Sequence, residues 1–218
     1  MDLLPWIADE RRSVARLIEG LSPQQLATAS LCEGWTVQDV AAHLLVPLVT
    51  PMPRFALAMV RSGFDFDRAN RRMTAVVARR PVEEIVAGLR SHAEHPFAPP
   101  GMSHAAPLTD LLVHQQDIRR PLGLRAELVP ERLQVCLGFA YAAVDRPGRK
   151  APVPAAARAG AFTGLRWEAT DLDWSRGDGP VVNGAGEALL MMLMGRVSAV
   201  EDLSGDGAAV LRERLGRF

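Results

Sequence analysis

Apolar residues recur at intervals of three, four and seven through the first 145 residues, with charged residues between them. This period is typical of amphipathic helices that bury one face. Prolines mark several breaks, because proline suits the first turn of a helix and disfavours helix in the residue before it. We therefore expect helices over 6–28 (broken at 22–23), 36 to about 43, 54–61, 67–79, 81–92, 107–120 and 129–143.

The pattern changes near residue 160. The segment 146–160, RPGRKAPVPAAARAG, is rich in proline, alanine, glycine and basic residues and is typical of a linker. Residues 165–173 then alternate apolar and polar side chains, as a half-buried strand does. We expect a turn, a strand and two helices to follow, over 174–179, 180–183, 186–196 and 208–217. The sequence thus predicts a mainly α protein, with a helical domain over 1–145 and a small α+β domain over 160–218.

Composition and charge narrow the class of protein. The 218 residues are 48% hydrophobic and 23% charged, which suits a globular core of normal size. Basic and acidic residues both number 25, so the formal charge is zero. Because nucleic acids and anionic membranes both demand a basic face, we expect neither as the main partner, although a local basic patch stays open.

The start of the chain, the absence of a long apolar run and the cysteines lead us to expect a cytoplasmic protein. The start, MDLLPWIADERRSVARL, turns charged within its first residues and lacks the pattern of a signal peptide. No apolar run approaches the ~20 residues that a membrane helix needs. Cys32 and Cys136 form no metal-binding spacing. We interpret them as small buried apolar residues in a reducing compartment.

One candidate for metal chemistry lies in residues 35–50, WTVQDVAAHLLVPLVT. Thr36 is expected to cap this helix, with Asp39 as its capping-box partner. His43 stands at the edge of the apolar stripe. Pro47 has no N–H for the carbonyl of this histidine, so we expect the helix to kink or end just after it.

A second candidate lies in residues 107–123, PLTDLLVHQQDIRRPLG, where Asp110 and His114 are four residues apart. This spacing places both side chains on one face of a helix, one turn apart. A carboxylate–imidazole pair of this kind offers two ligand atoms to one cation. With His43 it forms a three-ligand set that leaves a position open, as in catalytic zinc sites. We therefore predict a metal ion between the two segments.

The residue pattern leaves other interpretations open. A DxxxH spacing often arises by chance in helices. His43 taken alone is more readily a structural histidine at the edge of the core, and Asp110 could cap its helix or pair with Arg119 or Arg120. The remaining histidines are interpreted as solvated residues near or in a proline-rich loop over 95–107; they are His92, His95 and His104.

Three stretches in a fixed order resemble a known family. They are GWTVQDVAAHL at 34–44, DLLVHQQDIRRPLG at 110–123, and ATDLDWSRGDGPVVNGAGEALLMMLMGR at 169–196, followed by LSGDG at 203–207. They are similar to the signature segments of the mycothiol-dependent maleylpyruvate isomerase family, within the DinB-like superfamily. The resemblance implies a DinB-like four-helix bundle, a divalent metal at one end, usually zinc, and a small α+β C-terminal domain.

The resemblance also implies a ligand set. The family uses one histidine and a Glu-x-x-x-His pair, and the matching positions here hold His43, Asp110 and His114. Aspartate is one methylene shorter than glutamate, which leaves direct binding, binding through a water and a change of ion all open. Asp117 and Gln115 are the implied acceptors that orient the ligating imidazoles.

The implied function is that of a metal-dependent transferase or isomerase. The metal would hold the thiolate of mycothiol or a related thiol, which adds or transfers to a small electrophile. Arg196 is implied as a catalytic residue that closes the site and binds an anionic group, with a helix-end charge as its alternative role. We expect residues 95–107 to line the substrate pocket. The other two hypotheses are a non-catalytic module that binds a metal or small ligand, and a metal-dependent hydrolase that uses metal-bound hydroxide; substrate and oligomeric state stay open.

Overall fold

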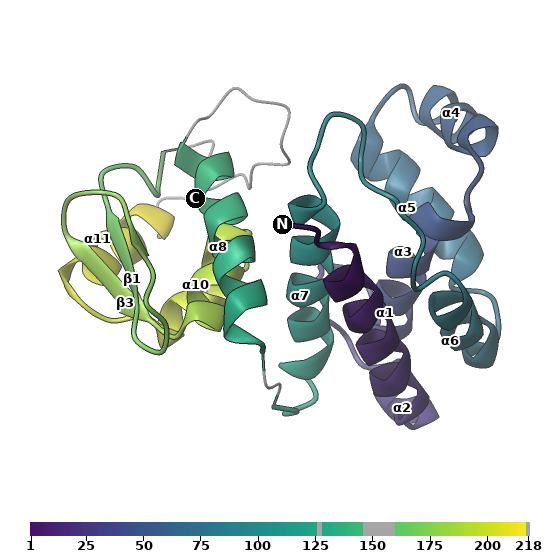
Figure 1. Ribbon diagram of the computed structural model, residues 1–218, viewed down its shortest axis with the longest axis horizontal. Helices are drawn as coiled ribbons and strands as arrows, with labels where there is room; N and C mark the ends of the chain where they lie inside the picture. Colours follow the sequence, from purple (N-terminus) through teal and green to yellow (C-terminus); the bar gives the residue numbers. More distant parts are fainter. Residues whose placement is uncertain (126–127, 146–159, 217–218) are drawn as a thin grey trace. The chain divides into compact units, whose positions relative to one another are not determined.

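The structure, a computed structural model, describes residues 1–125, 128–145 and 160–216. The chain divides into two compact units, one formed by 1–99 with 114–126 and the other by 100–113 with 127–218. The division falls inside a single helix, α7 (Ala105–Arg119). Figure 1 labels the helices and strands of both units.

The first unit is helical. Besides part of α7, it contains α1 (Leu4–Glu19), α2 (Pro23–Leu26), α3 (Val37–Val49), α4 (Met52–Arg61), α5 (Phe66–Val77) and α6 (Val82–Ser91). α1 packs against α6, and α3 packs against both α5 and α6. Their apolar faces form the core, whose most deeply buried side chains include Ile7, Ile18, Leu45, Ile85 and Leu89.

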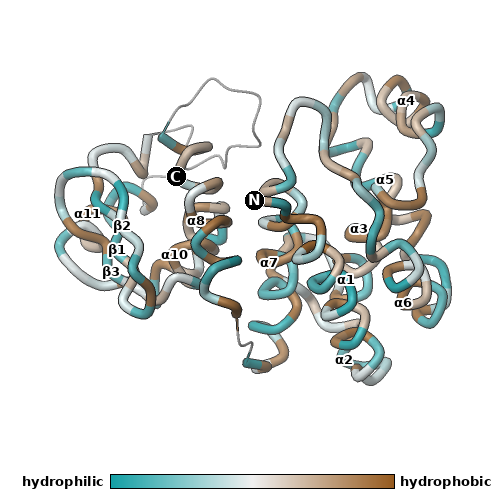
Figure 2. The backbone as a smooth tube through the Cα atoms, in the orientation of Figure 1, coloured by the Kyte–Doolittle hydropathy of each residue, from teal (hydrophilic) through white to brown (hydrophobic). Residues whose placement is uncertain are grey.

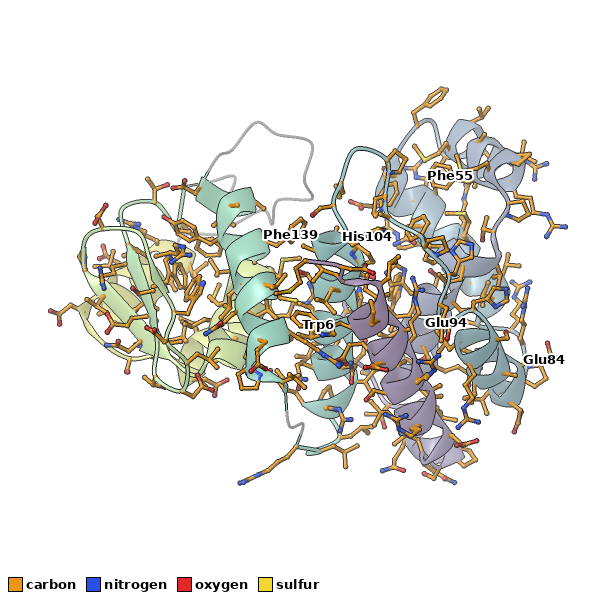
Figure 3. All side chains as sticks on the ribbon, viewed as in Figure 1. Trp6, Phe55, Glu84, Glu94, His104 and Phe139 are labelled. Atoms are coloured by element: carbon orange, nitrogen blue, oxygen red, sulfur yellow. The ribbon has the colours of Figure 1, made fainter. Side chains whose placement is uncertain are left out.

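A buried arginine joins α1 to the end of α6. Arg11 is 3% exposed. Its Nη1 donates to the carbonyl oxygens of His92, Ala93 and His95. These carbonyls follow the last turn of α6, where no helical N–H remains to satisfy them. Burial lowers the pKa of Arg11 to about 10, well below the usual value of a guanidinium. The neighbouring Arg12 instead pairs at the surface with Glu94, which Figure 3 labels.

The helix that carries His43 begins as expected and ends later than expected. The Thr36 hydroxyl accepts from the Asp39 N–H, and the Asp39 carboxylate accepts from the Thr36 N–H, so the predicted capping box is confirmed. The expected end after His43 is wrong, because α3 continues through Pro47 to Val49. Val46 and Leu48 of this last turn are buried, and tertiary packing of this kind outweighs the loss of one helical hydrogen bond.

The second unit combines a small sheet with helices. The strand order is β2-β1-β3, with β1 (Arg166–Ala169) antiparallel to β2 (Ser175–Arg176) and parallel to β3 (Val181–Gly184). Trp167 on the central strand is fully buried and pairs in register with Val182. The helices are α8 (Pro130–Asp145), α10 (Gly186–Leu193), the 3-10 helix η1 (Val197–Asp202) and α11 (Asp206–Leu215).

The predicted fold class is confirmed: the described chain is mainly helical, with a small α+β region near its C-terminal end. Figure 2 shows the mixed hydrophobic and hydrophilic colouring of its helices. The predicted linker, apart from residue 160, lies outside the described residues, and the domain limits 1–145 and 160–218 stay a prediction. No helix of the described ranges has the length and apolarity needed to cross a membrane.

Two local expectations for the second unit are corrected. The segment 174–179, expected to be a turn only, contains the short strand β2. The helix expected over 186–196 ends at Leu193. Gly195 adopts a φ of 87°. Its N–H and that of Arg196 donate to the carbonyls of Met192 and Met191, respectively, which is the Schellman arrangement that ends helices at glycine.

Candidate metal centre

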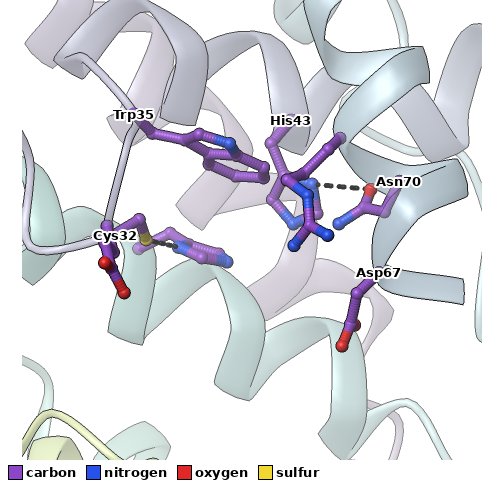
Figure 4. Close-up of a pocket in the computed structure, with 8 residues that line it drawn as sticks. Cys32, Trp35, His43, Asp67 and Asn70 are labelled. Carbon is purple, nitrogen blue, oxygen red and sulfur yellow. Dashed lines mark hydrogen bonds between the residues drawn. The ribbon is translucent and has the colours of Figure 1, made fainter.

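His43 projects from α3 toward α5. Its side chain is partly buried, and its Nδ1 lies 3.2 Å from Oδ1 of Asn70 on α5. Figure 4 shows this contact beside the indole of Trp35, whose ring centroid is 5.1 Å from that of His43. An oxygen acceptor at Nδ1 favours the tautomer with its proton on Nδ1. In this tautomer Nε2 is the unprotonated ring nitrogen, which is the atom through which the imidazole would bind a metal.

His114 lies on α7 and is held in the same way. It is 8% exposed, and its Nδ1 lies 2.8 Å from Oδ2 of Asp117, a fully buried carboxylate one turn further along the helix. This is the carboxylate–histidine arrangement that orients ligating imidazoles in metal sites. The predicted orienting role of Asp117 therefore has the geometry it requires, and Nε2 is the atom through which His114 would bind a metal.

The two imidazoles face each other across the site. Their ring centroids are 4.8 Å apart and their planes are inclined by 74°. Asp110 stands one turn before His114 on the same helix, so helical geometry sets the distance between this carboxylate and the imidazole. One ligand atom from each of His43, Asp110 and His114 lies within 4.8 Å of the other two.

These three residues fit a divalent ion in size and chemistry. A zinc ion bonded at about 2.0–2.1 Å spaces its ligand atoms by roughly 3.3–4.2 Å. Atoms within 4.8 Å of one another reach this spacing after side-chain movements of about 1 Å. Two neutral imidazoles and one carboxylate leave a bound dication with a net charge of +1, which suits a Lewis acid that retains an open position.

Cys32 lies at the same site, although sequence spacing gave no reason to place it there. Its Sγ donates to Oδ2 of Asp117 over 3.1 Å and lies 3.6 Å from Nδ1 of His114. The neighbouring Leu31 N–H donates to the carbonyl oxygen of Asp117 and ties this connection to α7. Cys32 therefore differs from its interpretation as a small buried apolar residue, because it is only partly buried and touches the acceptor of His114.

A surface pocket of about 220 Å³ opens over the histidines. Its walls come from the connection before α3 and from α3, α5 and α7. The lining residues are Cys32, Glu33, Trp35, His43, Asp67, Asn70, Arg71 and His114. None of them belongs to 95–107, so the expectation that this loop lines the pocket does not hold for the pocket beside the histidines.

Two other predicted residues lie elsewhere or stay untested. The side-chain amide of Gln115 donates to Glu10 on α1 over 2.7 Å, and both residues are buried, so Gln115 joins helices instead of orienting a ligand. Arg196 lies in the second unit, where its Nη1 donates to the carbonyl oxygen of Met194. Its role as a catalytic residue stays a prediction. His92, His95 and His104 are not in the candidate ligand groups of the described residues.

Comparison with known proteins gives one family. Residues 7–96 match the model of the mycothiol maleylpyruvate isomerase N-terminal domain. This range includes the segment 34–44 and His43, and it confirms the family resemblance for that part of the chain. The segments 110–123 and 169–196 lie outside the match. No curated protein sequence matches the chain closely enough to count as a relative.

Two solved structures are similar in fold. One is the crystal structure of the mycothiol-dependent maleylpyruvate isomerase and the other is a single-residue mutant of it. Both are 17% identical to the chain, with 95% of this chain and 97% of the other covered. The TM-scores are 0.49 and 0.48, respectively.

Proposed function

We propose that this chain, whose residues 7–96 match the mycothiol maleylpyruvate isomerase N-terminal domain, is a metal-dependent enzyme that uses a low-molecular-weight thiol. The thiol would be mycothiol or a close relative, and the reaction a transfer or an isomerisation of a small electrophile. His43, Asp110 and His114 would hold the divalent ion, for which zinc is the best candidate.

The observation that carries this proposal is the matched environment of the two histidines. Each has its Nδ1 on an oxygen acceptor, Asn70 for His43 and Asp117 for His114. Metal-binding histidines usually have an acceptor on the other ring nitrogen to fix the tautomer, and both histidines of this pair meet that condition. The 4.8 Å between the ring centroids is the second part of the same observation.

The ion, when bound, would supply a thiolate at neutral pH by lowering the pKa of a coordinated thiol. The protein's own residues would do the rest. Asn70 and Asp117 would fix the orientation of the two imidazoles. Trp35 gives the pocket an apolar wall beside His43, which limits the water that reaches a bound thiol. Arg71, also in the lining, offers a positive charge for an anionic group on the electrophile.

A thiol-consumption assay tests the proposal. Zinc-loaded protein is given mycothiol and a panel of small electrophiles that includes maleylpyruvate, and loss of free thiol or isomerised product is measured. We expect turnover that needs both the metal and the thiol and that falls at least about 100-fold in His43→Ala, a loss typical of a removed catalytic element. Turnover without thiol would support a hydrolase, and ligand-induced stabilisation without turnover would support a binding module.

A further inference from the structure

We propose that Cys32, His114 and Asp117 form a second metal site, on the opposite edge of the same imidazole that serves the His43 site. This site would take a thiophilic cation, with Cd²⁺ as its best probe. This second site rests on the proposed function only in that both sites use His114. Its chemistry differs from that of the first site because one of its ligands is sulfur.

The three donor atoms are already spaced for one ion. Sγ of Cys32 lies 3.1 Å from Oδ2 of Asp117 and 3.6 Å from Nδ1 of His114, and the last two atoms are 2.8 Å apart. A tetrahedral ion with bonds of about 2.0–2.3 Å spaces such donors by roughly 3.3–3.7 Å. The existing spacings differ from these values by about 0.5 Å or less, so the ion needs only a small expansion of the triangle.

Access and charge also suit a cation here. Cys32 is partly buried and lines the surface pocket, which gives an ion a route from solvent, whereas Asp117 is fully buried. A thiolate and a carboxylate together balance the charge of a dication. This balance matters because a charge held beside the buried Asp117 has little contact with water. The His43 site has only one carboxylate and leaves a bound dication with a positive charge. The two sites therefore differ in their ligand atoms, of which only those of the second site include sulfur, and in the net charge of a bound dication.

The two sites compete for the imidazole of His114. Without an ion, Oδ2 of Asp117 lies within hydrogen-bond distance of both Nδ1 of His114 and the Cys32 thiol. A cation at the sulfur site bonds to the thiolate and to Nδ1. The thiol proton is released to solvent, and the imidazole proton moves from Nδ1 to Nε2. With Nε2 protonated, His114 no longer offers a lone pair to the His43 site.

Titration with Cd²⁺ alone tests this site in the full chain. The readout is the ultraviolet charge-transfer absorption that appears only when a thiolate binds the metal. We expect saturable absorption in the parent protein, none in Cys32→Ser, and an affinity at least about 10-fold lower in Asp117→Asn. Cys136→Ser is the matched control, because Cys136 is fully buried on α8 and should not contribute.

His43→Ala separates this inference from the proposed function. It removes a ligand of the first site only, so it should abolish thiol turnover and leave the Cd²⁺ absorption within about twofold in affinity. Absorption that survives in Cys32→Ser, or that is lost in His43→Ala as completely as in Cys32→Ser, would overturn the sulfur site. Circular dichroism of each variant confirms that the fold is retained.

An independent feature is the hairpin of α4 and α5, and we infer that it docks on an anionic bilayer surface. None of the residues of α4 is fully buried. Exposed apolar side chains gather on the hairpin, and the largest are Met52 (66%), Leu57 (50%), Val60 (59%), Phe64 (74%), Phe66 (57%) and Val76 (64%). Phe55, labelled in Figure 3, contacts Phe66 between the two helices. Surface helices with such a face are typical of proteins that lie in the membrane interface.

Charge points to an anionic partner. Residues 51–81 contain seven arginines and two aspartates, a formal charge of +5, whereas the whole chain has a formal charge of zero. On α4, Met52, Ala56 and Val60 follow one another at intervals of four and share a face, with Arg54 and Arg61 off that face. This local basic patch opposes pairing with a second copy through the same face, since like charges would meet.

The turn of the hairpin holds Phe64 outward. Phe64 has a φ of 61°, the one positive value among the non-glycine residues of the described chain. Such a backbone is strained for a bulky side chain, and strain of this kind is found mainly at functional sites. A phenylalanine at the tip of a basic hairpin can enter the boundary between headgroups and acyl chains, whereas a nucleic acid offers no such apolar layer.

Co-sedimentation with vesicles tests the docking surface. We expect the parent protein to bind vesicles rich in phosphatidylglycerol, to bind phosphatidylcholine vesicles at least about 10-fold less, and to be released by salt. Phe64→Ser and Arg68→Glu/Arg72→Glu should each weaken binding several-fold, and Val197→Ser, in the other unit, is the control. Equal binding to both lipids, no binding to either, or dimerisation through α4 would overturn the inference.

Discussion

Asn70 is the acceptor that would orient His43 as a metal ligand. Asn70→Ala removes the oxygen at Nδ1 of His43, so the ring loses its fixed tautomer and orientation. We expect zinc affinity to fall by about 10–100-fold, as is usual when such a partner is lost. Isothermal titration of zinc measures this. Arg68→Ala, an exposed change on the same helix, should leave the affinity unchanged.

Arg11 offers a test of stability away from the metal. Arg11→Met removes a guanidinium bonded to three carbonyl oxygens, and we expect a loss of roughly 2–3 kcal/mol in the free energy of unfolding. Arg12→Ala, which breaks an exposed ion pair, should cost less than about 1 kcal/mol. Urea denaturation measures both.

The lowered pKa of Arg11 also predicts how this difference depends on pH. The folded-state pKa of about 10 lies below the ordinary value of a guanidinium, so burial of the charge costs stability at every pH below 10. That cost declines only as the pH rises above 10, where the folded state releases its proton before the unfolded state does. The difference between parent and Arg11→Met should therefore be constant from about pH 5 to 8, and a marked slope in this range would contradict the assignment.

The contacts of Cys32 and Gln115 could not be predicted from the sequence, because they join residues that lie far apart along the chain. The family resemblance implied the candidate ligand set, because its signature segments include the positions of His43, Asp110 and His114. Cys32 contacts His114 across 82 positions of sequence, from a connection without periodicity, and no local pattern encodes such a contact. Gln115 was misassigned because the helix turns it toward Glu10, which only packing reveals.

At the scale of elements, local signals predicted helix beginnings better than helix ends. The capping box of Thr36 and Asp39 is complete within four residues, so it can be identified from sequence alone. The end of α3 depends on packing around Pro47, and the short strand β2 depends on its pairing with β1. Both features are set by tertiary contacts that override local propensity.

The capping box gives a prediction for the helix that carries His43. Thr36→Ala leaves N-terminal N–H groups of α3 without an acceptor and should cost about 1 kcal/mol of stability. Because fraying would spread toward His43, zinc affinity should also fall. Ser22→Ala removes the equivalent capping box of α2 and is the matched control. It should lower stability without a change in zinc affinity, and an equal loss of affinity in both variants would refute the coupling.

Close packing of α6 on α3 predicts the outcome of a substitution that normally favours helices. A Cβ at Gly88 would lie 2.8 Å from Cδ2 of the fully buried Leu45. The gain of about 1 kcal/mol in helix propensity is therefore opposed by an overpacking cost of about 1–3 kcal/mol. We expect Gly88→Ala to be neutral or destabilising in thermal denaturation, and clear stabilisation would show that Leu45 moves aside freely.

At the scale of the whole molecule, metal binding should couple to stability. The ligands come from α3 and α7, so an ion that binds only the folded chain adds free energy to folding. Zinc at about 100 times its dissociation constant should add about 2.7 kcal/mol, and a chelator should remove it. Differential scanning fluorimetry with and without chelator measures the shift, and an unchanged melting temperature would indicate that no ion is held by the folded protein.

The central claim is that His43, Asp110 and His114 hold a metal ion, and metal content tests it most directly. Cys32→Ser provides the background without sulfur, into which His43→Ala is introduced; both proteins are equilibrated with zinc, dialysed and measured by mass spectrometry. We expect about one zinc per chain in Cys32→Ser and well under half of that in the double variant. Equal zinc in the two proteins would contradict the assignment of His43 as a ligand.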